Sequence, residues 1–118
     1  MDYFKKATRT MPAIIMDSST KSALVKGISI SDDWSSYQQI LTEIKQNLQR
    51  RIYNDFNFQL KVFNTKSAKL LLEIFREIKK SKHPISIHWL YDQKDAEMRE
   101  MGMDYSELLG MDFIVSPN

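Results

Sequence analysis

Hydrophobic and polar residues alternate in two short stretches near the start of the chain, a pattern typical of strands with one buried face. The stretches are AIIMD (residues 13–17) and SALVKGISI (residues 22–30), and the polar sequence DSST between them favours a tight turn. The two stretches are therefore predicted to form a hairpin. The dozen residues before them are polar and mixed in type, and we expect the tip of this segment to be poorly ordered.

Apolar residues then recur at spacings of three and four, which predicts an amphipathic helix. Asp32 or Asp33 can cap this helix, which is expected to begin near Trp34 and to end near Arg51. Its apolar stripe consists of Trp34, Tyr37, Ile40, Leu41, Ile44 and Leu48.

The same spacing returns further along and predicts a second helix from about Lys66 to Lys80. Its apolar stripe consists of Ala68, Leu71, Leu72, Phe75 and Ile78, widened by Leu70 and Ile74. Residues 93–118 predict an acidic helix start, a break at Gly102, a short further helix and a last strand at about 112–115.

Two more stretches alternate, NDFNFQLKVF (residues 54–63) before the second helix and HPISIHWLYD (residues 83–92) after it. Their apolar sides are expected to be Phe56, Phe58, Leu60 and Val62 in the first and Ile85, Ile87, Trp89 and Tyr91 in the second. A strand covered on both faces would be apolar throughout, so the helices are expected to crowd onto one side of these strands.

The element order is thus β-β-α-β-α-β-α-β. Strands separated by helices pair in parallel through right-handed crossovers. The order and the polar strand faces together predict an α/β fold, a two-layer sandwich with a mixed sheet, helices mainly on one face and a partly open opposite face. No repeat or linker interrupts the pattern, so residues 1–118 are predicted to form a single domain.

Charge does not favour a nucleic-acid partner. The 17 basic and 15 acidic residues give a net charge of +2 and are mixed along the chain, whereas nucleic-acid binders concentrate Lys and Arg. The longest basic groupings, Arg50-Arg51 and Lys79-Lys80, lie at predicted helix ends, where cations complement the helix dipole.

The sequence also lacks the usual signs of catalysis, metal binding or export. It has no cysteine, and neither His83 nor His88 has a partner at metal-ligand spacing. There is no glycine-rich phosphate loop and no apolar run of about 20 residues that could span a membrane. We therefore expect a cytoplasmic protein that is not an enzyme, with no metal, no cofactor and no membrane insertion. One alternative stays open, namely a small enzyme or ligand carrier that uses Gln59, Lys61, Ser86 and His88 on the open sheet face.

The junction between the strand at 54–63 and the second helix carries the sequence Asn64-Thr65-Lys66-Ser67. Asn64 or Thr65 can serve as the helix N-cap, which needs no functional explanation. The free amide groups and the positive end of the helix dipole also suit a phosphate at this place, with Lys66 and Lys69 within reach. A phosphoryl group on Thr65 would add about 1.5 to 2 negative charges there.

Several segments resemble the SiaC family of bacterial regulatory phosphoproteins, whose fold is similar to STAS domains and anti-sigma-factor antagonists. MPAIIMD and VKGIS are similar to the first two strands of the family, and FNTKSAKLLLEIF resembles its phosphosite segment. HWLYDQKDAEMREMGMDYSELLG resembles the family's segment of aromatic residues, acids, Met, Gly and an Asp-Tyr pair, and is the most specific match. The resemblance covers nearly the whole chain and implies a STAS-like sheet.

The resemblance implies a switch at Thr65, with Asn64, Lys66 and Ser67 as motif neighbours. Family members are phosphorylated at the equivalent threonine by a Ser/Thr kinase and dephosphorylated by a PP2C-type phosphatase. The unmodified form binds and activates a diguanylate cyclase, which raises cyclic-di-GMP and promotes biofilm growth. Two departures from the family pattern are Lys66, where a serine is usual, and SDDW (residues 31–34), where a Pro-Glu-Asn turn is usual.

The partner surface is expected to include the second helix, with Lys69, Leu70 and Ile74 as candidate contacts. Burial of Leu70 and Ile74 under a neighbouring element is an equally good explanation of these two apolar residues. A further alternative is an anti-sigma-factor-antagonist type of regulator, since that class shares the STAS-like fold.

Overall fold

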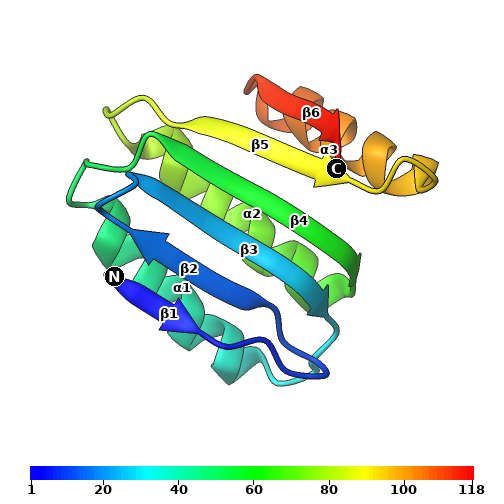
Figure 1. Cartoon of the computed structure of the whole chain (residues 1–118), viewed down its shortest axis with the longest axis horizontal. Coiled ribbons are helices and arrows are strands. Elements are labelled where there is room, and N and C mark those ends of the chain that lie inside the picture. Colours follow the sequence, from blue (N-terminus) through cyan, green and yellow to red (C-terminus); the bar gives the residue numbers. More distant parts are fainter.

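The computed structural model describes all of residues 1–118 and contains six strands and three helices (Figure 1). In chain order the elements are β1 (Tyr3–Lys5), β2 (Ala13–Asp17), β3 (Ser22–Ser29), α1 (Trp34–Leu48), β4 (Asp55–Phe63), α2 (Thr65–Lys80), β5 (Ser86–Tyr91), α3 (Ala96–Leu109) and β6 (Phe113–Pro117). None of the helices is long and apolar enough to cross a membrane.

The six strands form one mixed sheet in which spatial order follows chain order, β1-β2-β3-β4-β5-β6. β1, β2 and β3 are antiparallel neighbours, and β3 to β6 are parallel. Each of the three βαβ crossovers leads to the next strand on the same side of the sheet. Because such connections are right-handed, all three helices lie on one face of the sheet (Figure 1). This arrangement confirms the predicted two-layer α/β sandwich with one open sheet face.

The core lies between the sheet and the helices and is built around aromatic residues. The Phe58 ring packs edge-on against Phe75 with 5.0 Å between centroids, and Trp89 lies 6.2 Å from Phe58. The fully buried set also includes Tyr37, Tyr53, Phe56, Ile14, Met16, Ile40, Ile44, Leu70 and Leu71. Burial of these large side chains supplies the main free energy that holds the two layers together.

The expectation of a poorly ordered N-terminus is wrong, because the first residues form the edge strand β1. β1 pairs with β2 from Tyr3–Met16 to Lys5–Ile14. The preceding carboxylate, Asp2, accepts hydrogen bonds from the Tyr53 hydroxyl and from Ser18 at 2.9 Å, and it forms an ion pair with Arg50 at 3.2 Å. These contacts to distant parts of the chain hold a segment whose composition alone suggests disorder.

The predicted burial of Val62 is also wrong, because a β-bulge shifts the alternation of β4. Gly27 pairs with Leu60 and Ile28 pairs with Val62, which leaves Lys61 as the extra residue. Beyond this point the inward position passes to Phe63, whose ring lies 6.2 Å from that of Trp89, and Val62 is 46% exposed.

The expected break at Gly102 does not occur, and α3 is one continuous helix. Gly102 is needed for packing, since a Cβ atom there would lie 2.3 Å from Cδ1 of Trp89. The Trp89 indole N–H also donates to the carbonyl of Met98 at 2.9 Å, one turn earlier. The glycine therefore allows α3 to lie directly on the tryptophan ring instead of ending the helix.

Candidate functional site

The sequence Asn64-Thr65-Lys66-Ser67 lies at the corner where β4 ends and α2 begins, as predicted. Of the two candidate caps, Asn64 is the N-cap and Thr65 is the first helical residue. The Asn64 side-chain oxygen accepts a hydrogen bond from the Ser67 N–H at 2.9 Å, and its amide group donates to the Ser31 carbonyl at 3.0 Å. Asn64 therefore fixes both the start of α2 and the loop that leads to α1.

Thr65 is exposed at this corner, and its hydroxyl makes no hydrogen bond with the rest of the protein. As the first helical residue it belongs to the turn whose backbone N–H groups have no intrahelical acceptor. The α2 dipole adds about half a positive charge at the same place. Thr65 thus combines an accessible hydroxyl with a local field that favours an added anion.

Ser67 stands only two residues further on but has the opposite environment. Its side chain is 1% exposed, and its hydroxyl donates to the Ser29 carbonyl at 2.6 Å. The same oxygen lies 2.5 Å from the Ser29 hydroxyl and 2.8 Å from the Tyr37 hydroxyl. This buried network joins β3, α1 and α2, and it leaves no room for a transferring enzyme to reach Ser67.

Lys66 and Lys69 both extend from the first turns of α2 toward the start of α1. The Lys66 ammonium donates to the carbonyl of Asp32, and the Lys69 ammonium lies 4.4 Å from the centre of the Trp34 ring. The second contact has the geometry of a cation–π interaction. The two lysines therefore connect the corner at Thr65 with the segment SDDW (residues 31–34) at the start of α1.

Asp33 is the N-cap of α1 and lies in the same region. Its carboxylate accepts hydrogen bonds from the Ser35 hydroxyl at 2.6 Å and the Ser36 hydroxyl at 2.9 Å. These bonds lower the pKa of Asp33 below its usual value, so the group is ionised at neutral pH. A phosphate on the adjoining corner would meet this fixed negative charge as well as the two lysines.

Leu70 and Ile74 cannot be partner contacts, which corrects the expectation from the apolar stripe of α2. Both are buried, at 1% and 0% exposure, because α2 packs its wide apolar side against the sheet and against α1. The exposed apolar residues at this corner come from strand ends instead. Ile30 follows β3 and is 42% exposed, and Val62 precedes the corner on β4. Pattern analysis missed both because each belongs to a segment that is otherwise correctly assigned to a buried strand.

The four residues considered for a site on the open sheet face do not come together. His88 is paired with Asp55 at 2.8 Å, and Ser86 lies at the opposite end of β5 from the carboxyl edge. Gln59 and Lys61 line a separate hollow, which they share with Lys26, Gly27, Leu60, Leu90, Asp92, Lys94, Asp95 and Asn118. The histidine–carboxylate pair therefore lies outside that hollow, and the geometry gives no support to catalysis there.

Comparison with known proteins connects this geometry with a family. Residues 5–117 match the model of the SiaC family, described as regulatory phosphoproteins. No curated protein matches the chain. Among solved structures, a chain of the crystal structure of the diguanylate cyclase SiaD in complex with its activator SiaC from Pseudomonas aeruginosa matches with a TM-score of 0.86 and 20% identity, covering 99% of this chain and all of that chain.

Two structures of SiaC itself from Pseudomonas aeruginosa also match. The apo form has a TM-score of 0.80 and 21% identity, with 100% of this chain and 98% of that chain covered. The other has a TM-score of 0.78 and 22% identity, with 100% and 99% covered. At these identities the structural matches show a shared fold over the full length of the chain.

Proposed function

Because the chain belongs to the SiaC family of regulatory phosphoproteins, we propose that it is a non-enzymatic signalling adaptor switched by phosphorylation of Thr65. In this proposal the unphosphorylated form binds and activates a diguanylate cyclase and so controls cyclic-di-GMP and biofilm growth. The observation that carries it is the contrast between the two hydroxyls of the motif. Thr65 is exposed and unbonded, whereas Ser67 is buried and fully engaged.

A Ser/Thr kinase would transfer the phosphoryl group to the Thr65 oxygen, and a PP2C-type phosphatase would remove it by hydrolysis. Both enzymes need the hydroxyl at the surface, where it is found. The added group carries about 1.5 to 2 negative charges. At the first residue of α2 it is stabilised by the helix dipole and lies near Lys66 and Lys69, so modification leaves the core in place.

The effect on a partner follows from where the charge is placed. Ile30 and Val62 give the corner an exposed apolar surface, and the Lys69 ammonium lies over the Trp34 ring at the start of α1. A cyclase that covers these residues would have to remove water from a dianion in the phosphorylated form, and an unpaired buried charge is strongly unfavourable. Phosphorylation would therefore weaken docking through local electrostatics and hydration.

Isothermal titration calorimetry with the cognate diguanylate cyclase tests this proposal. Thr65→Ala is expected to bind like the wild type, and Thr65→Glu to bind at least about tenfold more weakly, which corresponds to about 1.4 kcal/mol. Thr42→Glu is the matched control, because Thr42 is an exposed threonine on the outer surface of α1 and the substitution adds the same charge. If Thr65→Glu and Thr42→Glu weakened cyclase binding equally, the effect would come from net charge and not from the position of Thr65. Equal affinity of Thr65→Ala and Thr65→Glu would refute the switch.

A further inference from the structure

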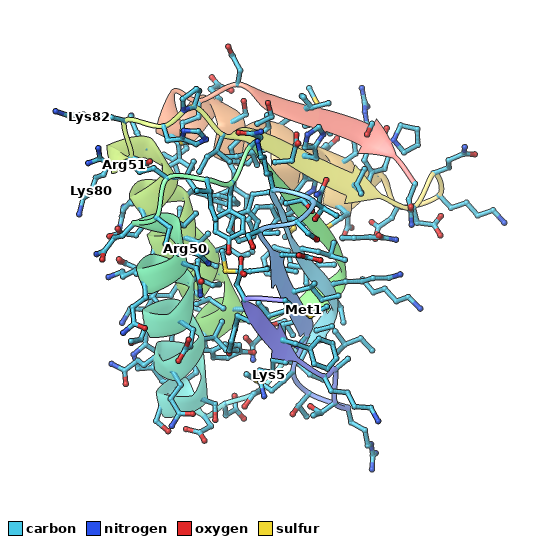
Figure 2. The ribbon with its side chains drawn as sticks, turned by 60° about the vertical axis from the view of Figure 1, so that its left-hand side comes forward. Met1, Lys5, Arg50, Arg51, Lys80 and Lys82 are labelled. Carbon is cyan, nitrogen blue, oxygen red and sulfur yellow. The ribbon has the colours of Figure 1, made fainter.

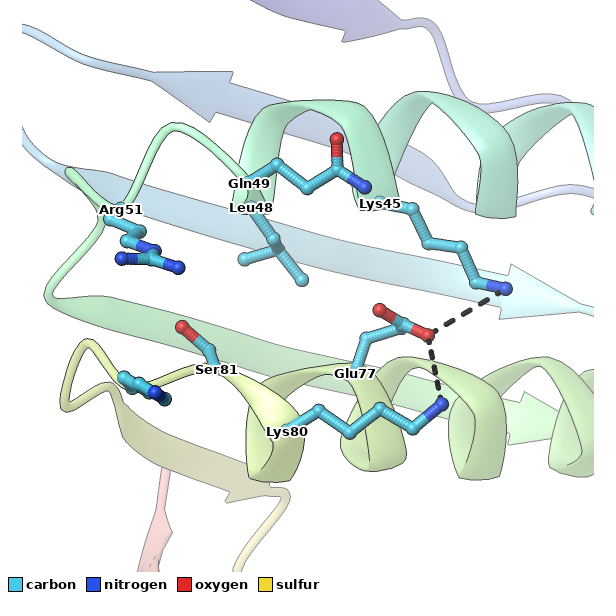
Figure 3. Close-up of a pocket in the computed structure, with 8 residues that line it drawn as sticks. Lys45, Leu48, Gln49, Arg51, Glu77, Lys80 and Ser81 are labelled. Carbon is cyan, nitrogen blue, oxygen red and sulfur yellow. Dashed lines mark ion pairs between the residues drawn. The ribbon is translucent and has the colours of Figure 1, made fainter.

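A polar cavity of about 240 Å³ lies between the C-terminal ends of α1 and α2, at the far end of α2 from Thr65 (Figure 3). Its lining residues are Lys45, Leu48, Gln49, Arg51, Glu77, Lys80, Ser81 and Lys82. Leu48 is the only apolar residue among them. Figure 2 shows Arg51, Lys80 and Lys82 gathered at this end of the helical layer.

Four cations line this cavity, namely Lys45, Arg51, Lys80 and Lys82, and two of them share one carboxylate. Glu77 lies 3.7 Å from the ammonium groups of both Lys45 and Lys80 (Figure 3). Charge-assisted hydrogen bonds are usually about 2.7 to 2.9 Å, so both of these ion pairs are loose. Arg51 and Lys82 take part in none of the five ion pairs of the protein. The cavity therefore contains cationic groups whose charge the protein does not balance.

The negative ends of the two helix dipoles are too weak to balance this excess of positive charge. Four cations and one carboxylate give a side-chain charge of 4 − 1 = +3. Each of the two helix C-termini contributes about half a negative charge, or about one together. A net charge of about +2 remains around this small cavity, whose Arg51, Lys80 and Lys82 are exposed to water, and it attracts an anion.

The backbone of Arg51 has an unusual conformation for a residue with a side chain. Arg51 has a φ angle of 58°, in the left-handed region, just after the end of α1. Glycine is the usual residue in this conformation at a helix end because a side chain is unfavourable there. In the structure this conformation directs the guanidinium group toward the cavity, opposite Ser81 (Figure 3).

The polar groups in the cavity are mainly hydrogen-bond donors. The Ser81 oxygen accepts a hydrogen bond from the His83 N–H at 3.2 Å, which leaves its own proton free to donate. The guanidinium group of Arg51 and the amide group of Gln49 provide further donors beside the three lysine ammonium groups. A ligand that fits this set is small, carries about two negative charges and offers several acceptor oxygens.

We propose that this cavity binds the phosphate dianion of a small phosphorylated ligand or of free phosphate. Arg51 and Ser81 would hold the phosphate oxygens, and Lys80 and Lys82 would balance its charge. An arginine fork matches the spacing of two phosphate oxygens. The proposal does not depend on Thr65, because α2 separates the cavity from the phosphorylation corner by a helix of 16 residues, about 24 Å long.

The test is an NMR titration of the full, unphosphorylated chain that follows backbone amide shifts at constant ionic strength. Inorganic phosphate, pyrophosphate and glycerol phosphate are the probes, and sodium chloride is the control salt. Saturable shifts at Gln49, Arg51 and Ser81 are expected with the phosphates but not with chloride. Tighter binding of glycerol phosphate would identify a phosphate ester as the ligand, and tighter binding of inorganic phosphate the free ion. Shifts that do not saturate, or that chloride reproduces, overturn the proposal.

Arg51→Gly separates binding from folding. It removes the guanidinium group and supplies the residue that the left-handed backbone prefers, so the melting temperature is expected to stay the same or rise while phosphate affinity falls at least tenfold. Lys21→Gly is the matched control, because Lys21 also carries a positive charge and a left-handed φ of 53° but does not line the cavity. Lys21→Gly should keep the affinity within twofold. Unchanged affinity in Arg51→Gly would refute the role of Arg51 and with it the site.

Discussion

Substitution with alanine removes the hydroxyl from Ser67 or from Thr65, and at Thr65 it also removes a methyl group. Although the two positions are two residues apart, the structure predicts opposite consequences. In Ser67→Ala the bond to the Ser29 carbonyl and the contacts with the Ser29 and Tyr37 hydroxyls are lost. In Thr65→Ala no hydrogen bond within the protein is lost, and the new residue has the highest helix propensity. Stability should therefore depend on Ser67 and modification on Thr65.

The size of the Ser67→Ala effect follows from the groups that remain. The Ser29 carbonyl keeps its hydrogen bond from the Asn64 N–H at 3.0 Å, and the Tyr37 hydroxyl keeps the Ser29 hydroxyl at 2.9 Å. No buried polar group is left without a partner, so the loss is that of net hydrogen bonds at about 0.5 to 1.5 kcal/mol each. We expect Ser67→Ala to lower the free energy of unfolding by about 1 to 2 kcal/mol.

Thermal unfolding followed by circular dichroism measures both variants. An entropy of unfolding of about 2.1 cal/mol/K per residue gives about 0.25 kcal/mol/K for this chain, so Ser67→Ala should melt about 4 to 8 °C lower than the wild type. Thr65→Ala should stay within about 2 °C, because exposed substitutions usually change stability by less than about 0.5 kcal/mol. Mass spectrometry after kinase treatment should then find phosphate on Ser67→Ala and none on Thr65→Ala. A stable Ser67→Ala together with a strongly destabilised Thr65→Ala would refute the assignment of roles.

Three further predictions concern the packing of α3, the N-cap of α2 and the anchoring of the N-terminal strand. Gly102→Ala should lower the free energy of unfolding by about 1 to 3 kcal/mol in a denaturant titration, because the new Cβ would overlap the Trp89 ring; unchanged stability would show that α3 shifts freely. Asn64→Ala should cost about 1 kcal/mol through loss of the N-cap and should lower the rate of phosphorylation by loosening the first turn of α2; an unchanged melting temperature would count against this. Hydrogen bonding from Tyr53 lowers the pKa of Asp2 below 3.8 in the folded state, so its stabilising effect is complete above about pH 4 and is lost as the pH falls through the lowered pKa. Asp2→Asn should therefore show a smaller drop in melting temperature than the wild type between about pH 5 and about pH 3, and identical pH profiles would contradict this.

Periodicity was sufficient to predict the central elements because their buried faces follow regular spacings. The alternation in residues 54–63 and the stripe of α2 identify a strand and a helix that the structure contains. The prediction for Val62 failed because a bulge depends on pairing with β3, and no local pattern in β4 reports it. β1 was missed for a similar reason, since its three residues are held by β2 and by the contacts of Asp2 with distant residues.

The features of the candidate site differ in the same way: some follow from the local sequence, and others depend on tertiary contacts. An Asn-Thr sequence before an apolar helix is enough to predict a cap at the start of α2, and the structure confirms Asn64 in this role. Which hydroxyl of the motif is accessible could not be derived, because Ser67 is covered by Ser29 and by Tyr37 from other elements. The burial of Leu70 and Ile74 likewise depends on how closely α1 and the sheet pack against α2.

In the proposed switch, one phosphoryl group at the first residue of α2 decides whether the cyclase can dock. The most direct measurement compares cyclase binding by the unmodified chain with binding by a chain that carries phosphothreonine installed at position 65 alone. The phosphorylated chain is expected to keep the same circular dichroism spectrum and to bind the cyclase at least tenfold more weakly. Equal affinity of the two forms would contradict the proposed switch.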